Sequence, residues 1–135
     1  IEIMKSSINT TKEAIYNVMN HHDELDNEMV AEAYHSFVLH KNAKVESFGS
    51  IIAAGKNAAT LHYEDNNMPI EEDSLLLMDV GCFTNNYSSD ITRTIPVSGK
   101  FTTRQKEVYE VVLDCNKKCI DLGSQILYSL IRSET

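Results

Sequence analysis

The chain has 135 residues, of which 42% are hydrophobic, so it can form one globular domain at most. Its 20 acidic side chains outnumber its 12 basic ones, and the formal net charge is −8 at pH 7. This balance excludes a nucleic-acid partner, since binding to a phosphate backbone requires a basic face. No apolar run reaches 18 residues, so we also expect no membrane partner.

The three cysteines argue against a disulfide scaffold, because their number is odd and no two of them form a C-x-x-C pair. Cys115 and Cys119 stand four residues apart, and without further ligands nearby they are interpreted as buried or half-buried thiols. The chain begins at Ile1 with no signal-peptide pattern. The missing signal peptide predicts a cytoplasmic protein. Because the first residue is not Met, we also expect the sequence to have been cut from a longer chain.

The amino-terminal 41 residues are predicted to form two helices. Apolar side chains recur at helical steps over residues 1–20, with an interruption at 9–11. A second helix is expected over 27–41, with Asp26 as its capping residue.

Strand patterns follow. Residues 48–54 read as a short buried strand, and 58–63 can extend the same sheet. Residues 75–78 form an apolar run of strand length, expected to be buried on both faces. The asparagines at 85–86 favour a hairpin. The side chains of 91–97 alternate between two faces, as those of a strand do.

The last expected element is a helix that opens with the capping-box spacing of Thr102 and Gln105. Its apolar positions run to Leu122, Gly123 weakens or ends it, and 125–131 can continue as a second segment. Two helices, a run of strands and a final helix indicate an α+β fold with an antiparallel sheet.

Two aspartates at the ends of predicted strands are candidate metal ligands. Asp79 ends the apolar strand, Asp90 begins the next one, and the hairpin between them brings both to one level of the sheet. Carboxylates held that close repel each other unless a divalent cation such as manganese, magnesium, cobalt or zinc relieves the repulsion. The alternative is that Asp79 caps a turn and Asp90 pairs with Arg93, and spacing alone leaves both open.

His62 is the second candidate, because a neutral imidazole at this strand end could donate to a substrate carbonyl or an oxyanion. The alternative is a hydrogen-bonded surface histidine. The remaining histidines are interpreted as structural or exposed: His21, His22, His35 and His40. No nucleotide-binding loop, G-x-S-x-G or H-E-x-x-H motif is present.

Taken together, several blocks resemble the pita-bread metallopeptidases, and most of all their Xaa-Pro aminopeptidase (aminopeptidase P) and prolidase branch. The blocks are residues 50–63, 77–81, 87–94 and 99–101, followed by the helix positions Gln105, Tyr109, Val112 and Leu113. The resemblance covers about 1–122. Asn86 replaces the family's usual Gly before a Tyr, and the usual Pro-Gly stretch is missing after Leu122.

The resemblance implies a fold and a site. Residues 1–135 would be the amino-terminal half of a pita-bread catalytic domain, with helices packed on a curved antiparallel sheet. Asp79 would bind one of two divalent metal ions, most often manganese, with zinc or cobalt as alternatives, and Asp90 would bridge both. His62 would bind substrate near the scissile carbonyl. Thr92 would contact the metal-binding aspartates without binding the metal ions itself.

The resemblance also implies a reaction, the hydrolysis of the bond between an N-terminal residue and proline by a hydroxide that bridges the two metal ions. The substrate would be a peptide with proline in second position, and the parent protein could be a homodimer. Because the family's metal-binding His and two Glu lie beyond residue 135, we expect this chain alone to be inactive. Alternatives are a prolidase, a relative acting on another substrate such as creatine, or a non-catalytic peptide- or protein-binding member.

Overall fold

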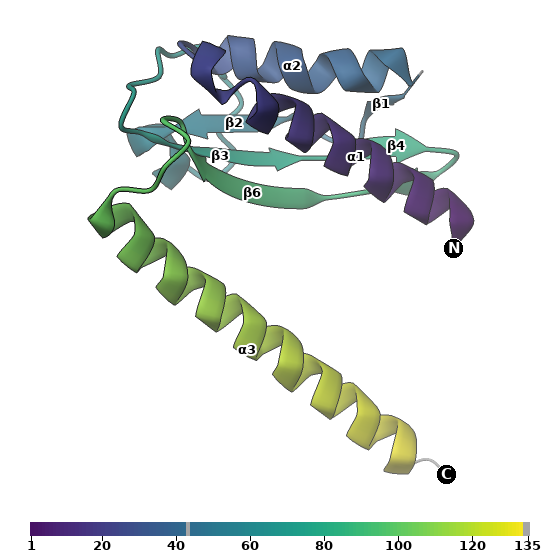
Figure 1. Cartoon of the computed structure of the whole chain (residues 1–135). Helices are drawn as coiled ribbons and strands as arrows, with labels where there is room; N and C mark the ends of the chain where they lie inside the picture. Colours follow the sequence, from purple (N-terminus) through teal and green to yellow (C-terminus); the bar gives the residue numbers. More distant parts are fainter. Residues whose placement is uncertain (43, 134–135) are drawn as a thin grey trace. The chain divides into compact units, whose positions relative to one another are not determined.

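The computed structural model describes residues 1–42 and 44–133, with side chains through residue 125, and divides into two compact units. The first unit, Ile1–Lys100, holds the following elements (Figure 1): α1 (Glu2–Asn20), η1 (His22–Glu24), α2 (Glu28–Lys41), β1 (Val45–Glu46), β2 (Ile51–Ala54), η2 (Gly55–Ala59), β3 (Leu75–Val80), β4 (Cys82–Thr84), β5 (Tyr87–Ser88) and β6 (Ile91–Pro96). The second unit, Phe101–Thr135, consists of α3 (Thr103–Ser133). The expected α+β class is confirmed.

Two three-stranded antiparallel sheets form the first unit, in the orders β2-β3-β6 and β1-β4-β5. The sheets are continuous in the chain, because β3 leads into β4 through Gly81 and β5 leads into β6 through Ser89 and Asp90. A Cβ atom at Gly81 would lie 2.1 Å from the carbonyl oxygen of Ser89. Only glycine allows the two strands to approach this closely where the sheet bends.

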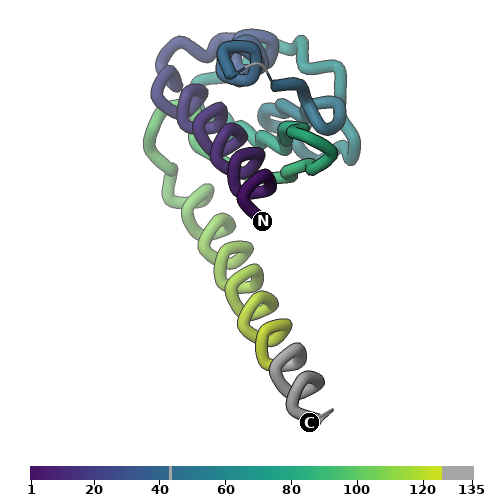
Figure 2. The backbone as a smooth tube through the Cα atoms, turned by 90° about the vertical axis from the view of Figure 1, so that its right-hand side faces the viewer, coloured from purple at the N-terminus to yellow at the C-terminus, as the bar shows by residue number. Residues whose placement is uncertain are grey.

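Helices α1 and α2 run side by side over one face of the β2-β3-β6 sheet (Figures 1 and 2). Their apolar side chains pack on the alternate strand residues that face them, because successive side chains of a strand point to opposite faces. The buried cluster comprises Ile15, Val18, Leu25, Ala31, Ile52, Ala54, Leu76, Met78, Val80 and Val97. A smaller cluster of Ile51, Ala53 and Tyr63 lies on the other face.

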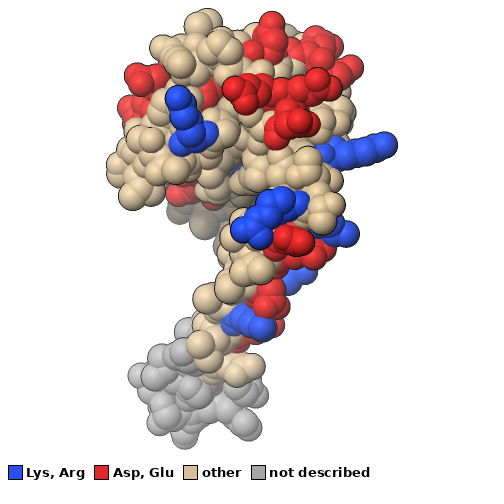
Figure 3. All heavy atoms as spheres, turned by 90° about the vertical axis from the view of Figure 1, so that its left-hand side faces the viewer, with Lys and Arg blue, Asp and Glu red and all other residues tan. Residues whose placement is uncertain are grey.

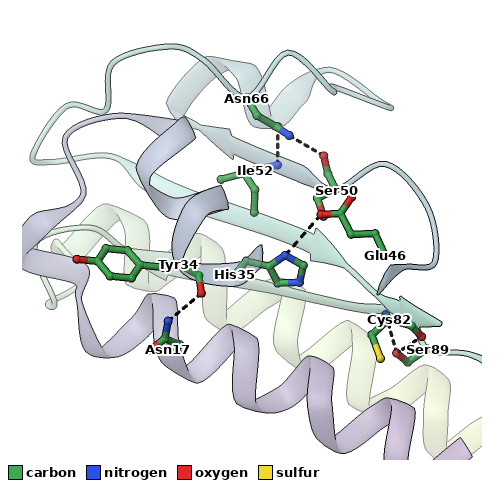
Figure 4. A network of polar contacts seen from close by, with 9 residues as sticks. All are labelled: Asn17, Tyr34, His35, Glu46, Ser50, Ile52, Asn66, Cys82 and Ser89. Carbon is green, nitrogen blue, oxygen red and sulfur yellow. Dashed lines mark hydrogen bonds and ion pairs between the residues drawn. The ribbon is translucent and has the colours of Figure 1, made fainter. Parts of the chain in front are cut away.

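Side chains, rather than another strand, cover the outer edge of β2. The backbone N–H of Ile52 donates to Oδ1 of Asn66 at 2.9 Å, and Nδ2 of Asn66 donates to the carbonyl of Ser50 at 2.7 Å (Figure 4). Two residues further on, the N–H of Ala54 donates to Oε1 of Glu28 at 2.8 Å. An edge whose donors are occupied in this way cannot serve as a template for an additional strand.

Two details of the helices differ from the sequence prediction. The cap of α2 is Asn27 rather than Asp26, since the Asn27 side chain accepts a 2.9 Å hydrogen bond from the N–H of Met29. Residues 9–11 do not interrupt α1, because Thr10 and Thr11 are buried and Thr10 Oγ1 donates back to the carbonyl of Ser6 at 3.1 Å.

The strand prediction for 58–63 is wrong, because Gly55 adopts a φ of +53° and starts the 3-10 helix η2 instead. Strand β2 also begins at Ile51, three residues later than expected. The hairpin at 85–86 is confirmed, and both asparagines have positive φ. The expected burial of 75–78 on both faces is wrong, since Leu75 and Leu77 are only half-buried.

Helix α3 begins with the predicted capping box. The N–H of Thr102 donates to Gln105 Oε1 at 2.8 Å, and the N–H of Gln105 donates to Thr102 Oγ1 at 3.3 Å. Gly123 does not end the helix, which runs unbroken to Ser133. Cys115 and Cys119 are exposed on it, contrary to expectation.

Acidic side chains predominate on the face of the first unit shown in Figure 3, as the net charge of −8 leads one to expect. Within the part of the chain that the structure describes, no helix is both long and apolar enough to cross a lipid bilayer.

Candidate active site

The strand register places Asp79 and Thr92 directly opposite each other on β3 and β6. Both lie on the face of the sheet that α1 and α2 leave open, since their neighbours Met78 and Val80 point into the core beneath the helices. Thr92 Oγ1 donates a 2.8 Å hydrogen bond to Asp79 Oδ1. One oxygen of the carboxylate is thereby held in a fixed direction.

Asp90 follows a residue that is locked to helix α1. The buried Ser89 Oγ accepts the backbone N–H of Cys82 at 3.0 Å (Figure 4), and it lies 2.7 Å from Thr11 Oγ1 and 3.1 Å from Ser7 Oγ. These contacts fix the backbone at the start of β6. Because successive side chains alternate between faces, Asp90 is exposed on the open side while Ser89 is buried.

The two carboxyl groups affect each other. Partial removal from solvent raises the pKa of the Asp90 carboxyl group, and the negative charge of Asp79 and a hydrogen bond with Asp79 raise this pKa further. A pair of carboxylates that crowd each other in this way is stabilised by a bound cation, which removes the repulsion. The convergence predicted from the hairpin is therefore confirmed, and the role of the pair as metal ligands stays a prediction.

His62 lies in the loop after η2 and adopts a φ of +53°. It shares a cavity of about 330 Å³ with both aspartates, and the lining residues are Phe48, Gly49, Ile51, His62, Glu64, Asp79 and Asp90. The structure thus brings together His62, Asp79 and Asp90, which the sequence singled out, and Thr92 bonds to one of them. Their chemical roles remain predictions.

Four lining residues were not anticipated: Phe48, Gly49, Ile51 and Glu64. Glu64 stands two residues after His62 in the same loop, where no regular spacing marks it. A Cβ atom at Gly49 would lie 3.1 Å from the carboxyl carbon of Glu64, so the missing side chain makes room for this carboxylate. Nothing in the local sequence marks Phe48 or Gly49 as part of a cavity.

The donor set fits part of a metal site. Hard divalent ions prefer carboxylate oxygens, which Asp79 and Asp90 supply. Among the residues that the structure describes, however, no group of three or more His, Cys, Asp or Glu side chains is arranged to hold a metal ion. A complete site would need ligands in addition to these two.

A model of metallopeptidase family M24 matches residues 2–124. This chain belongs to metallopeptidase family M24. Proteins of this family use divalent metal ions. A probable Xaa-Pro aminopeptidase of Phaeosphaeria nodorum is 42% identical over 131 residues, which are 96% of this chain and 28% of the relative. Xaa-Pro aminopeptidase 3 of Dictyostelium discoideum is 53% identical over 97 residues, which are 71% of this chain and 19% of the relative.

Solved structures agree with the sequence comparison. Aminopeptidase PepP of Pseudomonas aeruginosa superposes with a TM-score of 0.79 at 36% identity, over 86% of this chain and 26% of that one. A zinc-substituted Escherichia coli aminopeptidase P in complex with product superposes with a TM-score of 0.78 at 30% identity, over 84% of this chain and 26% of that one. The M24 chain spans about a quarter of the length of these relatives. The pita-bread assignment is confirmed for the part of the fold that it covers.

Proposed function

We propose that this chain is the amino-terminal half of the catalytic domain of an Xaa-Pro aminopeptidase, which hydrolyses the bond between an N-terminal residue and proline. The observation that carries the proposal is the cavity on the open face of the sheet, which His62 lines together with Asp79 and Asp90. The chain's membership of family M24 and its similarity to named Xaa-Pro aminopeptidases support the same activity.

In this proposal each residue has one task. Asp79 and Asp90 hold metal ions, and Thr92 keeps Asp79 oriented through its 2.8 Å hydrogen bond. His62 donates a hydrogen bond to the scissile carbonyl of the peptide as negative charge develops on its oxygen. Two bound divalent ions, for which we propose manganese with zinc or cobalt as alternatives, would lower the pKa of a water molecule and polarise the carbonyl.

The wider setting is part of the proposal. Residues 1–135 would belong to one catalytic domain, completed by further metal ligands from another part of the protein. We place the protein in the cytoplasm and propose a homodimer as its assembly. A peptide with proline in second position would be its partner at the site.

The full-length protein, supplied with manganese, is the material for the test. We expect it to release the first residue from a tripeptide with proline in second position, and Asp79→Asn and Asp90→Asn to abolish the release. Asp121→Asn, an exposed aspartate on α3, is the matched control and should leave the rate unchanged. The 135-residue chain alone should release nothing.

Two results would overturn the proposal. Cleavage of Xaa-Pro dipeptides without any cleavage of the tripeptide would make the protein a prolidase. Binding of the tripeptide without any release, in the presence of manganese, zinc or cobalt, would make it a non-catalytic peptide-binding member of the family.

A further inference from the structure

Glu28 is a fully buried carboxylate in the first turn of α2. It accepts four hydrogen bonds. Oε1 accepts from the N–H of Ala54 at 2.8 Å and from Asn57 Nδ2 at 2.9 Å. Oε2 accepts from the hydroxyl of Tyr63 at 2.6 Å and from the N–H of Met68 at 3.1 Å. A buried carboxylate needs such donors, because removal from water is otherwise costly.

The four donors come from one stretch of chain. Residues 54, 57, 63 and 68 bracket the segment 54–68, which leaves the end of β2, turns through η2 and returns toward α2. The backbone N–H of Glu28 also donates to the carbonyl of Met68 at 3.0 Å. Glu28 therefore holds both ends and two interior points of this segment.

The ionisation of the pair formed by Glu28 and Tyr63 agrees with this arrangement. Burial acts to raise the pKa of Glu28, but the hydrogen bonds from Asn57, Tyr63 and the two backbone N–H groups outweigh it and lower the pKa. Burial and the bond to Glu28 raise the pKa of Tyr63 to about 12. At neutral pH the carboxylate is charged and the phenol keeps its proton, so the bond persists.

His62 stands inside this segment, immediately before Tyr63. Tyr63 points inward to Glu28 and to the cluster with Ile51 and Ala53, while His62 lines the cavity with the two aspartates. Leu61, on the other side, is 91% exposed. Within the described part of the chain, no hydrogen bond to the His62 side chain is found, so its direction depends on the backbone that Tyr63 anchors.

We infer that Glu28 is a positioning residue, whose buried carboxylate sets the 54–68 segment so that His62 faces Asp79 and Asp90. This inference rests on the proposed function, in which His62 contacts the substrate. Glu28 itself does not line the cavity and would not touch the reacting atoms.

The test is a double-mutant cycle in the full-length protein. Glu28→Gln keeps the shape but removes the charge and two acceptor lone pairs. We expect it to lower kcat/KM about 10- to 100-fold, since misplacement of a catalytic group by about 1 Å has an effect of this size. In a His62→Ala background the same change should lower kcat/KM less than about 3-fold, because the group that Glu28 positions is gone.

Tyr63→Phe is a milder variant, for the case that Glu28→Gln does not fold. It should lower kcat/KM about 3- to 10-fold. In the His62→Ala background it should have almost no effect on kcat/KM. Glu13→Gln, an exposed glutamate on α1, removes one charge elsewhere and should change nothing. Equal losses in both backgrounds would show a structural role only and would overturn the inference.

A second readout does not depend on turnover. In NMR spectra of the full-length protein, Glu28→Gln should shift the imidazole signals of His62 and leave those of His21, which stacks on Tyr34, in place. If wild-type protein is inactive, the proposed function fails, and this measurement still decides the inference. Unchanged His62 signals in both Glu28→Gln and Tyr63→Phe would overturn it.

Discussion

The hydroxyl of Thr92 and the carboxylate of Asp79 face each other across two strands of one sheet, joined by a hydrogen bond of 2.8 Å. Thr92→Val removes this hydroxyl and preserves the shape of the side chain. We expect manganese affinity of the full-length protein to fall about 10- to 100-fold, as is usual when a partner of a ligating carboxylate is lost. Isothermal titration calorimetry measures the change.

The matched control for this substitution is Thr94→Val, two residues further along β6 on the same face and opposite Leu77. Its manganese affinity should equal that of the wild type. An equal loss of affinity in both variants would mean that the hydroxyl of Thr92 has no specific role.

Asp90→Asn should separate metal binding from stability. Without metal, the variant should unfold at the same temperature as the wild type or a higher one, because the repulsion with Asp79 is relieved. Added manganese should no longer raise the melting temperature. At 100 times its Kd, a ligand stabilises a native protein by about 2.7 kcal/mol, which differential scanning fluorimetry detects. Asp121→Asn should keep the response to manganese.

Ser89→Ala should destabilise the first unit by about 1–3 kcal/mol, since the buried N–H of Cys82 loses its acceptor. Urea denaturation measures this loss. Ser88→Ala, at the exposed neighbouring position, should change stability by no more than about 0.5 kcal/mol. A small effect at position 89 would mean that another group or water replaces the lost acceptor.

His35 should make the protein sensitive to acid. It is fully buried, neither ring nitrogen has a hydrogen-bond partner among the described residues, and burial lowers its pKa to about 4. The nearest acidic group is Glu46, whose Oε1 lies 3.9 Å from Nδ1 (Figure 4). Because the folded pKa lies below the unfolded value of about 6.5, the stabilisation is present above pH 6.5 and is lost as the pH falls through 4.

The stability that the protein loses over this range through His35 is about 3.5 kcal/mol at most, at about 1.4 kcal/mol per pKa unit. His35→Leu should flatten the dependence of the unfolding free energy on pH between 7 and 4. His40→Leu, at an exposed position of the same helix, should leave it as in the wild type. A wild-type curve that is already flat in this range would contradict the prediction.

Much of the fold could be predicted from sequence because its signals are local. The alternation over β6, the asparagine pair at 85–86 and the capping box at Thr102 each act within a few residues. The convergence of Asp79 and Asp90 followed from the same logic, since a hairpin fixes which strand positions meet.

What the sequence could not reveal depends on distant contacts. The segment 58–63 was expected to extend the sheet, yet the chain turns away at Gly55, and Glu28 and Asn66 occupy the free edge of β2. In the same way, the polar side chains of Thr10 and Thr11 look like a break in a helix, and their burial, with Thr11 beside Ser89, becomes visible only in three dimensions.

The contact between Ser7 and Ser89 spans 82 residues, and this distance has a consequence during synthesis on the ribosome. At roughly 5–20 residues per second, about 4–16 s separate the emergence of the two hydroxyl groups. During that interval Ser7 and Thr11 lack the partner that Ser89 gives them in the folded unit. The polar contacts between α1 and Ser89 therefore cannot form until nearly all of the first unit has been synthesised.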